Sequence, residues 1–476
     1  MKDINRRSFI KGTTALGATL GILGPIGVIA GNAAPALASG ELLGSEVAGG
    51  KLYVYAGSWG HMGGTDGITA FEYNPTTGGL TLIKEINDYI RCGQTTCDFE
   101  DGYFYCEDER TPNPDFGGNK PDNAASGGAG GGNVWSFKVD RATGILTEIG
   151  KTYSYGAQPS YVTLTDEKDY MLVTLYGGKT SVTQLIRVAD GSYQILTVPN
   201  AACTQLFRMN EDHTIGDIVD SYQHYNRGHE NNAEEFEWCN AHAVIKAPDG
   251  KLFVTCDKGA STVTPFVVDH KNGKLKVSAE TYDQQNNEGA RYAIFHQTKP
   301  FLYINNEKFA SIDVCTYDKY GNLEKVQTVC PLPEEYVNEK LKVKVVPAGG
   351  KFEQQDFKLH PNGKYIYNMM RCANGYTSEW EGCSVLEIKE NGLLELVQFK
   401  KLDTLWPRGC AVSPDGKWFL VASLYAEELL TLPISANGQL GEIVARTPQR
   451  SACNLTFFPE KYTPAARPFV HTYSSK

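Results

Sequence analysis

The chain has 476 residues, of which 41% are hydrophobic and 21% charged, so it can bury a large core as one large domain or as two or three smaller ones. Its 49 Gly, 26 Tyr and 20 Phe favour a β-rich protein. The formal net charge of −10 argues against nucleic acid or an anionic membrane surface as the main partner, because both need clustered Lys and Arg. A local group of Arg could still bind a small anion.

The N-terminal residues predict an export signal. The motif "RRSFIK" (6–11) precedes a moderately apolar Gly/Ala-rich run, and "ALA" (36–38) matches a cleavage site. The pattern resembles a twin-arginine signal peptide over residues 1–38, followed by a linker at 39–50. A transmembrane anchor is the alternative, but Gly, Pro and Asn interrupt the apolar run. We therefore expect export by the Tat translocon, a mature protein without a transmembrane anchor, and a periplasmic or extracellular location.

One β-rich pattern, consisting of a strand, a Gly-containing turn and a second strand, recurs along the remaining chain. The copies are seven segments: 67–86, 133–152, 182–198, 262–281, 312–329, 383–400 and 429–445. A second hairpin, with a turn such as Asp249-Gly250, precedes most copies. Two hairpins make a four-stranded sheet, and sheets that recur in this way are typical of propeller blades. The sequence predicts an all-β protein over residues 51–465, a seven-bladed β-propeller of four-stranded antiparallel blades.

The two ends of this region are predicted to close the ring. Strand-like segments stand at 51–58 and 453–460, and pairing them would leave no free edge. Two stretches do not fit the blade pattern: the Gly/Pro-rich segment 111–132, read as a loop, and residues 199–238, read as an insertion before the fourth blade. The insertion contains His213, His224 and His229, whose spacing matches no standard set of metal ligands, so neither a metal nor another cofactor is predicted.

The twelve cysteines allow disulfides in an exported protein. Cys97 and Cys106 flank Asp101-Gly102 symmetrically, so a cross-strand bond between them is one expectation. Cys372 and Cys383 bracket a loop and form a second candidate pair. The sequence has no C-x-x-C spacing, which argues against a zinc knuckle or a thioredoxin-like site.

Polar residues recur at the ends of the first hairpin in four consecutive predicted blades. Residues equidistant from a hairpin turn are neighbours, which pairs His242 with Asp257, Arg291 with Glu307, Asp356 with Arg371, and Arg408 with Ser423. The first strand of each propeller blade is innermost, so these ends converge at one mouth of the central channel. Charged residues at strand ends are common. Their repetition in four blades, three of which contain Arg, favours a binding or catalytic site.

Four segments carry a resemblance to the β-propeller lactonase family, which includes bacterial 6-phosphogluconolactonase and fungal carboxymuconate cyclase. They are 156–178, 240–259, 289–307 and 406–423, and the resemblance extends over about residues 52–460. It implies a catalytic set of His242, Glu307, Arg291 and Arg371. It also implies substrate-binding roles for Arg408, Asp257, Asp356, Tyr292 and Tyr176. This chain departs from the family pattern at Asn240, Tyr292, Met370, Leu175 and Asp356, which affects the identity of the substrate more than the reaction type.

Lactone hydrolysis needs a base that activates water and fixed positive charge for the oxyanion. Glu307 or His242 could be the base, while Arg291 and Arg371 hold the oxyanion or a substrate carboxylate. The same groups would suit the reverse cyclisation of a muconate-like diacid. The sequence contains no G-x-S-x-G motif, which argues against a catalytic serine nucleophile. The sequence therefore predicts an exported enzyme that uses no cofactor, a lactone hydrolase or intramolecular lyase acting on a small lactone or carboxylate. The alternative is a non-catalytic propeller that binds a ligand or protein partner at the same mouth.

Overall fold

The computed structural model describes most of the region after the predicted signal peptide. The described residues are 42–60, 66–86, 90–109, 132–154, 156, 158–177, 181–187, 193–199, 202–224, 239–284, 288–334, 351–373 and 381–465. The predicted signal peptide, the Gly-rich segment 111–131 and His229 lie outside them. No helix among the described residues is long and apolar enough to cross a membrane.

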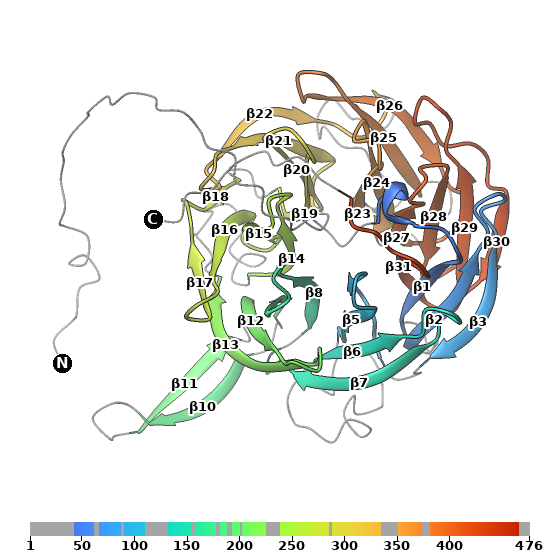
Figure 1. Cartoon of the computed structure of the whole chain (residues 1–476). Coiled ribbons are helices and arrows are strands. Elements are labelled where there is room, and N and C mark those ends of the chain that lie inside the picture. Colours follow the sequence, from blue (N-terminus) through green and yellow to red (C-terminus); the bar gives the residue numbers. More distant parts are fainter. Residues whose placement is uncertain are drawn as a thin grey trace, which may run out of the picture. The chain divides into compact units, whose positions relative to one another are not determined.

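The described strands form seven antiparallel blade sheets and one separate two-stranded sheet, which confirms the predicted seven-bladed propeller of four-stranded blades (Figure 1). Blade 1 contains β1 (Leu52–Trp59), β2 (Asp66–Tyr73), β3 (Leu80–Ile86) and β31 (Ala452–Pro459). Blade 2 contains β4 (Thr95–Asp98), β5 (Tyr103–Glu107), β6 (Asn133–Val139) and β7 (Leu146–Tyr153). Blade 3 contains β8 (Pro159–Leu164), β9 (Tyr170–Leu175), β12 (Cys203–Met209) and β13 (Ile215–Gln223).

The remaining four blades follow in chain order. Blade 4 contains β14 (Ala241–Lys246), β15 (Leu252–Asp257), β16 (Thr262–Asp269) and β17 (Lys274–Val277), with β18 (Tyr282–Asp283) added beside β16. Blade 5 contains β19 (Ala290–Phe295), β20 (Phe301–Asn306), β21 (Ser311–Tyr317) and β22 (Leu323–Val329). Blade 6 contains β23 (Lys351–Leu359), β24 (Tyr365–Ala373), β25 (Gly382–Ile388) and β26 (Leu394–Lys401). Blade 7 contains β27 (Pro407–Val412), β28 (Trp418–Ser423), β29 (Glu428–Pro433) and β30 (Ala445–Pro448).

The ring closes between the two ends of the propeller region, as predicted. β31 pairs with β1 over Leu52↔Pro459 to Ser58↔Ala452, so the last strand of the chain completes the first blade. One strand of each blade also contacts its counterpart in the next blade, in the order β31, β4, β8, β14, β19, β23, β27 and back to β31. These seven strands therefore surround the centre of the ring, while β3, β7, β13, β17, β22, β26 and β30 lie at its periphery (Figure 1).

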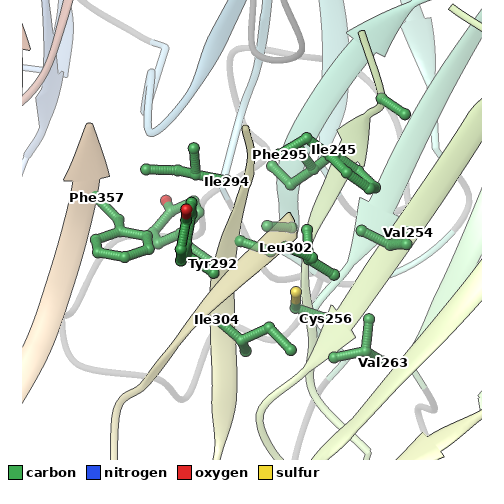
Figure 2. Packing of buried hydrophobic residues seen from close by; sticks show 14 of the residues in the cluster. Ile245, Val254, Cys256, Val263, Tyr292, Ile294, Phe295, Leu302, Ile304 and Phe357 are labelled. Atoms are coloured by element: carbon green, nitrogen blue, oxygen red, sulfur yellow. The ribbon is translucent and has the colours of Figure 1, made fainter. Parts of the chain in front are cut away.

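Burial is greatest in the inner strands of the blades. Every residue of β14 and of β15 is buried, whereas the peripheral β17 is largely exposed. A sheet that packs between two neighbours needs apolar side chains on both faces. Figure 2 shows side chains of β14 and β15, such as Ile245 and Val254, facing Leu302 and Ile304 of β20 in one continuous core. The blades are thus held together by apolar packing between adjacent sheets.

The third predicted blade hairpin is wrong. Residues 182–198 form β10 (Ser181–Arg187) and β11 (Tyr193–Pro199), a separate two-stranded sheet, and blade 3 is completed by β12 and β13 instead. These two strands lie in the stretch 199–238 that was predicted to be an insertion. The alternation of apolar residues is a local signal, and it does not say which neighbouring strand a hairpin joins. His224 is buried against Thr204, with 2.8 Å between its Nε2 and the hydroxyl oxygen, and His213 stacks on Tyr103.

Neither predicted disulfide is present, because Cys97, Cys106 and Cys383 are free thiols. Cys97 pairs with Phe104 and Cys106 with Thr95, so the hairpin is centred one residue before the predicted point and the two thiols are out of register. In the predicted linker, η1 (Gly44–Glu46) packs against the ring, where Val47 forms a bridge with Tyr462.

Candidate functional site

A β-bulge recurs at one position in the innermost strands of five blades. The pairing of each of these strands with its neighbour skips one residue, which is Cys453 in blade 1 and is Ser160, His242, Arg291 and Arg408 in blades 3, 4, 5 and 7. A bulge bends the strand and changes the direction of the side chain that it carries. Three of the residues predicted for the site therefore owe their direction to the same backbone irregularity.

In blades 3, 4, 5 and 7 a second recurring position lies sixteen residues after the bulge. It is occupied by Tyr176, Lys258, Glu307 and Leu424. The backbone N–H of each donates to the carbonyl of the residue two positions before the bulge, over 2.8 Å from Tyr176 to Gln158, 3.0 Å from Lys258 to Asn240, 2.8 Å from Glu307 to Gly289 and 3.0 Å from Leu424 to Trp406. Bulge and second position thus form a repeated frame that presents two side chains per blade.

The irregular registers correct all four predicted pairings, because Ala290 pairs with Asn306 and Arg291 is itself skipped, although the side chains of Arg291 and Glu307 meet. Asp257 pairs with Ala241 rather than with His242, and Ser423 pairs with Pro407 rather than with Arg408, because the bulge shifts each register by one residue. Arg371 pairs with Glu353, and not with Asp356, because β23 is also irregular between Gln354 and Phe357.

Glu307 lies at the centre of a group of cations from three blades. Its carboxylate is 2.9 Å from Nε of Arg291 and 2.8 Å from Nζ of Lys258, and Nη2 of Arg371 is 3.9 Å away. Burial alone would raise the pKa of Glu307, but these three positive charges outweigh it and hold the pKa well below its usual range. Glu307 is therefore a permanent anion and a very weak base.

Lys258, which the sequence did not single out, supplies the shortest of these contacts. Its ammonium also lies 5.2 Å from the ring centroid of Tyr176. Burial opposes the charge of Lys258, but the carboxylate of Glu307 outweighs burial and raises the pKa above its usual value. The ammonium is consequently a fixed charge at all physiological pH values.

His242 is buried between two tyrosines, with ring centroids 5.0 Å from Tyr292 and 6.0 Å from Tyr176. Burial, and next the charge of Arg291, lower the pKa of His242 well below its usual value. The imidazole is thus neutral at neutral pH. Its Nδ1 has no hydrogen-bond partner among the described residues, although the atom is buried. His242 combines a neutral ring with an available nitrogen, both of which a general base needs, while its low pKa makes the ring a weaker base than an ordinary imidazole.

Two further guanidinium groups are each bound to a carboxylate. Arg371 donates from Nε (3.1 Å) and Nη2 (2.8 Å) to Glu353, and Nη2 of Arg408 lies 2.6 Å from Oε2 of Glu109. Nη1 of Arg408 and Nη1 of Arg291 are buried without a hydrogen-bond partner in the part of the chain that the structure describes. An unpartnered buried donor is costly, so both atoms are suited to bind an acceptor on a ligand.

Charges in the site do not balance. Lys258, Arg291, Arg371 and Arg408 contribute four positive charges, whereas Glu307, Glu353 and Glu109 contribute three negative ones among the described contacts. The surplus of one positive charge favours an anionic ligand or a developing oxyanion.

Of the other residues predicted to bind substrate, Tyr292 contacts side chains of the site, whereas Asp257 and Asp356 bind backbone groups. The hydroxyl of Tyr292 accepts a 2.7 Å hydrogen bond from Gln94 across the ring, and its ring centroid lies 4.6 Å from the guanidinium of Arg291. Asp257 accepts from the backbone N–H groups of Asn240 (2.7 Å) and Ala260 (2.9 Å), and burial raises its pKa to about 6. Asp356 accepts from the N–H of Cys410 (2.9 Å) on β27.

The structure thus brings His242, Arg291, Glu307, Arg371, Arg408, Tyr176 and Tyr292 together and adds contacts that the sequence analysis missed. The missed residues are Lys258, Glu353, Glu109, Trp406 and Trp59. Asp257 and Asp356 bind backbone groups that fix the loops and strands around the site. The sixteen-residue spacing would have identified Lys258. No local signal points to Glu109 or Glu353.

Comparison with known proteins places these observations in a family context. The family described as "Lactonase, 7-bladed beta-propeller" matches residues 53–457. The 6-phosphogluconolactonase of Cronobacter sakazakii is 28% identical over 135 residues, which span 28% of this chain and 35% of that protein. The 6-phosphogluconolactonase of Blochmanniella floridana is 25% identical over 192 residues, 39% of this chain and 51% of that protein. The chain therefore aligns with about a third to a half of the length of these relatives.

The fold also matches a solved structure. The periplasmic gluconolactonase of Pseudomonas aeruginosa superposes with a TM-score of 0.68 at 17% sequence identity, covering 86% of this chain and 99% of that one. At this level of identity the match concerns the fold.

Proposed function

Because the chain belongs to the seven-bladed β-propeller lactonase family, we propose that it hydrolyses a small lactone at the site formed by His242, Arg291, Glu307 and Arg371. The observation that carries this proposal is the Nδ1 of His242, which is neutral and has no hydrogen-bond partner among the described residues, beside a surplus of fixed positive charge. Hydrolysis of an ester needs a proton acceptor and stabilisation of an oxyanion, and the site contains groups suited to both.

In the proposed reaction, His242 takes a proton from water as the water oxygen bonds to the lactone carbonyl carbon. The carbonyl oxygen becomes an oxyanion, which accepts from Nη1 of Arg291. When the ring C–O bond breaks, the protonated His242 returns its proton to the leaving oxygen, and the product is a hydroxy acid. No metal or organic cofactor enters these steps.

Glu307 has a supporting role in this mechanism. Its low pKa makes it a poor base. Of the two residues that the sequence analysis named as candidates for the base, Glu307 and His242, we therefore assign the role to His242. The carboxylate of Glu307 instead holds Arg291 and Lys258 through contacts of 2.9 Å and 2.8 Å, and so keeps Nη1 of Arg291 fixed. Arg371 and Arg408 are proposed to bind the polar groups of the substrate, with Tyr176 and Tyr292 beside the base.

The activity test uses purified mature protein and two sets of lactones, neutral ones and ones that carry a carboxylate. Acid release is followed with a pH indicator. His242→Asn should lower kcat by at least about 100-fold, because it removes the general base. The matched control is Ser160→Ala, which changes the same bulge position in blade 3, where the hydroxyl donates to the carbonyl of Ala241 over 2.9 Å.

Two outcomes would contradict the proposal. If no lactone is hydrolysed but one of them raises the melting temperature, the site belongs to a non-catalytic binding propeller. If His242→Asn retains full activity, another group is the base. Cyclisation of an unsaturated diacid, the reverse type of reaction, is tested by incubation with such a diacid and detection of the lactone.

Export to the periplasm is proposed on separate evidence. The "RR" pair at residues 6–7 and the "ALA" at 36–38 support a twin-arginine signal, and the structurally similar Pseudomonas aeruginosa enzyme is described as periplasmic. Residues 1–38 fused to a reporter should direct it through the Tat translocon, and replacement of both arginines by lysine should retain it in the cytoplasm. Export of the lysine variant at the normal rate would contradict the proposal.

A further inference from the structure

Trp406 has a backbone conformation that is unfavourable for a large side chain. Its φ is 60°, in the left-handed region that bulky residues rarely adopt. It stands two residues before the bulge at Arg408, and the matching residues in blades 3 and 5 are Gln158 (φ 54°) and Gly289 (φ 80°). The frame does not require this conformation, because Asn240 at the matching position of blade 4 does not have a positive φ, whereas Gly289 in blade 5 adopts it without strain. The backbone alone gives no reason for an indole in blade 7.

The side chain of Trp406 instead makes two close planar contacts. Its ring stacks on Tyr425, with 4.4 Å between the centroids and 8° between the planes. The guanidinium carbon of Arg371 lies 3.9 Å from the indole centroid. A guanidinium stacked on an aromatic face has a cation–π attraction and a defined plane. Tyr425 in turn restrains the indole, so the three planar groups form one assembly.

Arg371 needs such a restraint because its polar contacts with the described residues leave its orientation open. Both of its nitrogens that bind Glu353 donate to the same oxygen, Oε2, at 3.1 Å and 2.8 Å. A guanidinium held at a single oxygen can pivot about it, unlike a pair that uses both oxygens of the carboxylate. The contact with Glu307, at 3.9 Å, is too long to prevent this movement.

We propose that Trp406 is a positioning residue that fixes the plane of the Arg371 guanidinium for contact with the substrate. The role in turnover rests on the proposed lactonase function, whereas the restraint on Arg371 does not. Trp406 thus accepts an unfavourable backbone conformation in exchange for the orientation of a binding group, a common arrangement at functional sites.

The test is Trp406→Gly, compared with Trp406→Phe and with wild type. Glycine accepts the positive φ, so the variant should keep or raise the melting temperature while losing the stacked ring. Its KM should rise at least tenfold with a smaller change in kcat, and Trp406→Phe, which retains an aromatic face, should restore most of the loss. Gln158→Gly is the matched control, since it makes the same backbone change in blade 3.

A readout independent of turnover separates this inference from the proposed function. In wild-type protein labelled with ¹⁵N-arginine, the Nε–H signal of Arg371, assigned with Arg371→Lys, should be shifted by the indole ring current. The shift should disappear in Trp406→Gly. Absence of turnover in wild type would contradict the lactonase proposal. The ring-current shift would still show whether Trp406 fixes the guanidinium of Arg371. An unshifted wild-type signal, or an unchanged KM in Trp406→Gly, would overturn the role of Trp406. If Trp406→Gly does not fold, Trp406→Asn replaces it, because Asn also tolerates positive φ.

Discussion

Replacing Lys258 by Met tests the electrostatic account of the site. Met keeps the length of the side chain and removes the ammonium that lies 2.8 Å from Glu307. The carboxylate is not left alone, because Nε of Arg291 remains at 2.9 Å. The loss should therefore be that of one charge-assisted hydrogen bond, about 1.5–3 kcal/mol of unfolding free energy. It should stay below the roughly 3–5 kcal/mol expected when a buried charge loses its only partner.

The same substitution should move the pH dependence of the reaction in a defined direction. The charge of Lys258 is one of the causes that lower the pKa of His242, after burial and Arg291. Because the base acts in its neutral form, kcat/KM of the wild type should stay constant well below pH 6.5 and fall only at the depressed pKa. Removal of the ammonium raises the pKa of His242, so the acid side of the profile should move to higher pH.

The assay is kcat/KM for one lactone from pH 4 to 8, in wild type and Lys258→Met. Lys276→Met is the control, because Lys276 belongs to the same blade but pairs with Asp269 at the periphery. Its profile should coincide with that of the wild type. An acid limb that stays in place or moves to lower pH in Lys258→Met would refute the assignment of His242 as the base that feels these cations.

Three further predictions concern stability. Glu307→Gln should lower the free energy of unfolding more than Lys258→Met does, by about 3–5 kcal/mol in chemical unfolding, because Arg291 and Lys258 both lose their carboxylate partner. An equal or smaller loss than in Lys258→Met would contradict the central position of Glu307. Stability should decrease as the pH falls below 6.5, because burial lowers the pKa of His224 to about 3 and that of His296 to about 4, and the pKa of His242 also lies well below 6.5. The unfolded chain then takes up protons that the folded chain does not. His242→Asn should show a shallower decrease, and a pH-independent free energy of unfolding would exclude this linkage. Gly250→Ala should lower the free energy of unfolding by more than about 1 kcal/mol, since φ is 73° and a Cβ would lie 1.8 Å from Asp166. Gly363→Ala, at φ 70° and with its nearest neighbour 3.6 Å from the added Cβ, should lower it less. Equal losses would show that the side chain of Asp166 moves away from the Cβ without loss of stability.

The architecture was predictable because its signals are local. Alternating apolar residues and Gly turns predicted seven sheets, and strand-like ends predicted the closure that β1 and β31 make. The error at 182–198 arose where two hairpins of similar pattern follow each other and only one pairs with β9. The choice between them depends on packing against the neighbouring blades, which alternation does not encode.

The site was predictable only in part because a bulge moves the register by one residue. Counting symmetrically from the turn selected Asp257, whereas the side chain that reaches Glu307 is that of the next residue, Lys258. The interval of sixteen residues between Arg291 and Glu307, applied to His242, gives Lys258 directly. The interval is visible in the sequence, but it identifies a site residue only where the blade also has the bulge, as blades 3, 4, 5 and 7 do.

Contacts across the ring carry no such signal. Arg408 binds Glu109 although 299 positions separate them, and Gln94 reaches Tyr292 from blade 2 to blade 5. These partners decide the charge of the site, because Glu109 neutralises Arg408 and Glu353 neutralises Arg371, which the sequence analysis had paired with Ser423 and Asp356. Four cations with one acidic residue would predict a strongly anionic ligand, whereas the observed surplus of one positive charge suits a single carboxylate or a transient oxyanion. The charge of the site therefore depends on residues from separate blades, which converge only when the last strand closes the first blade.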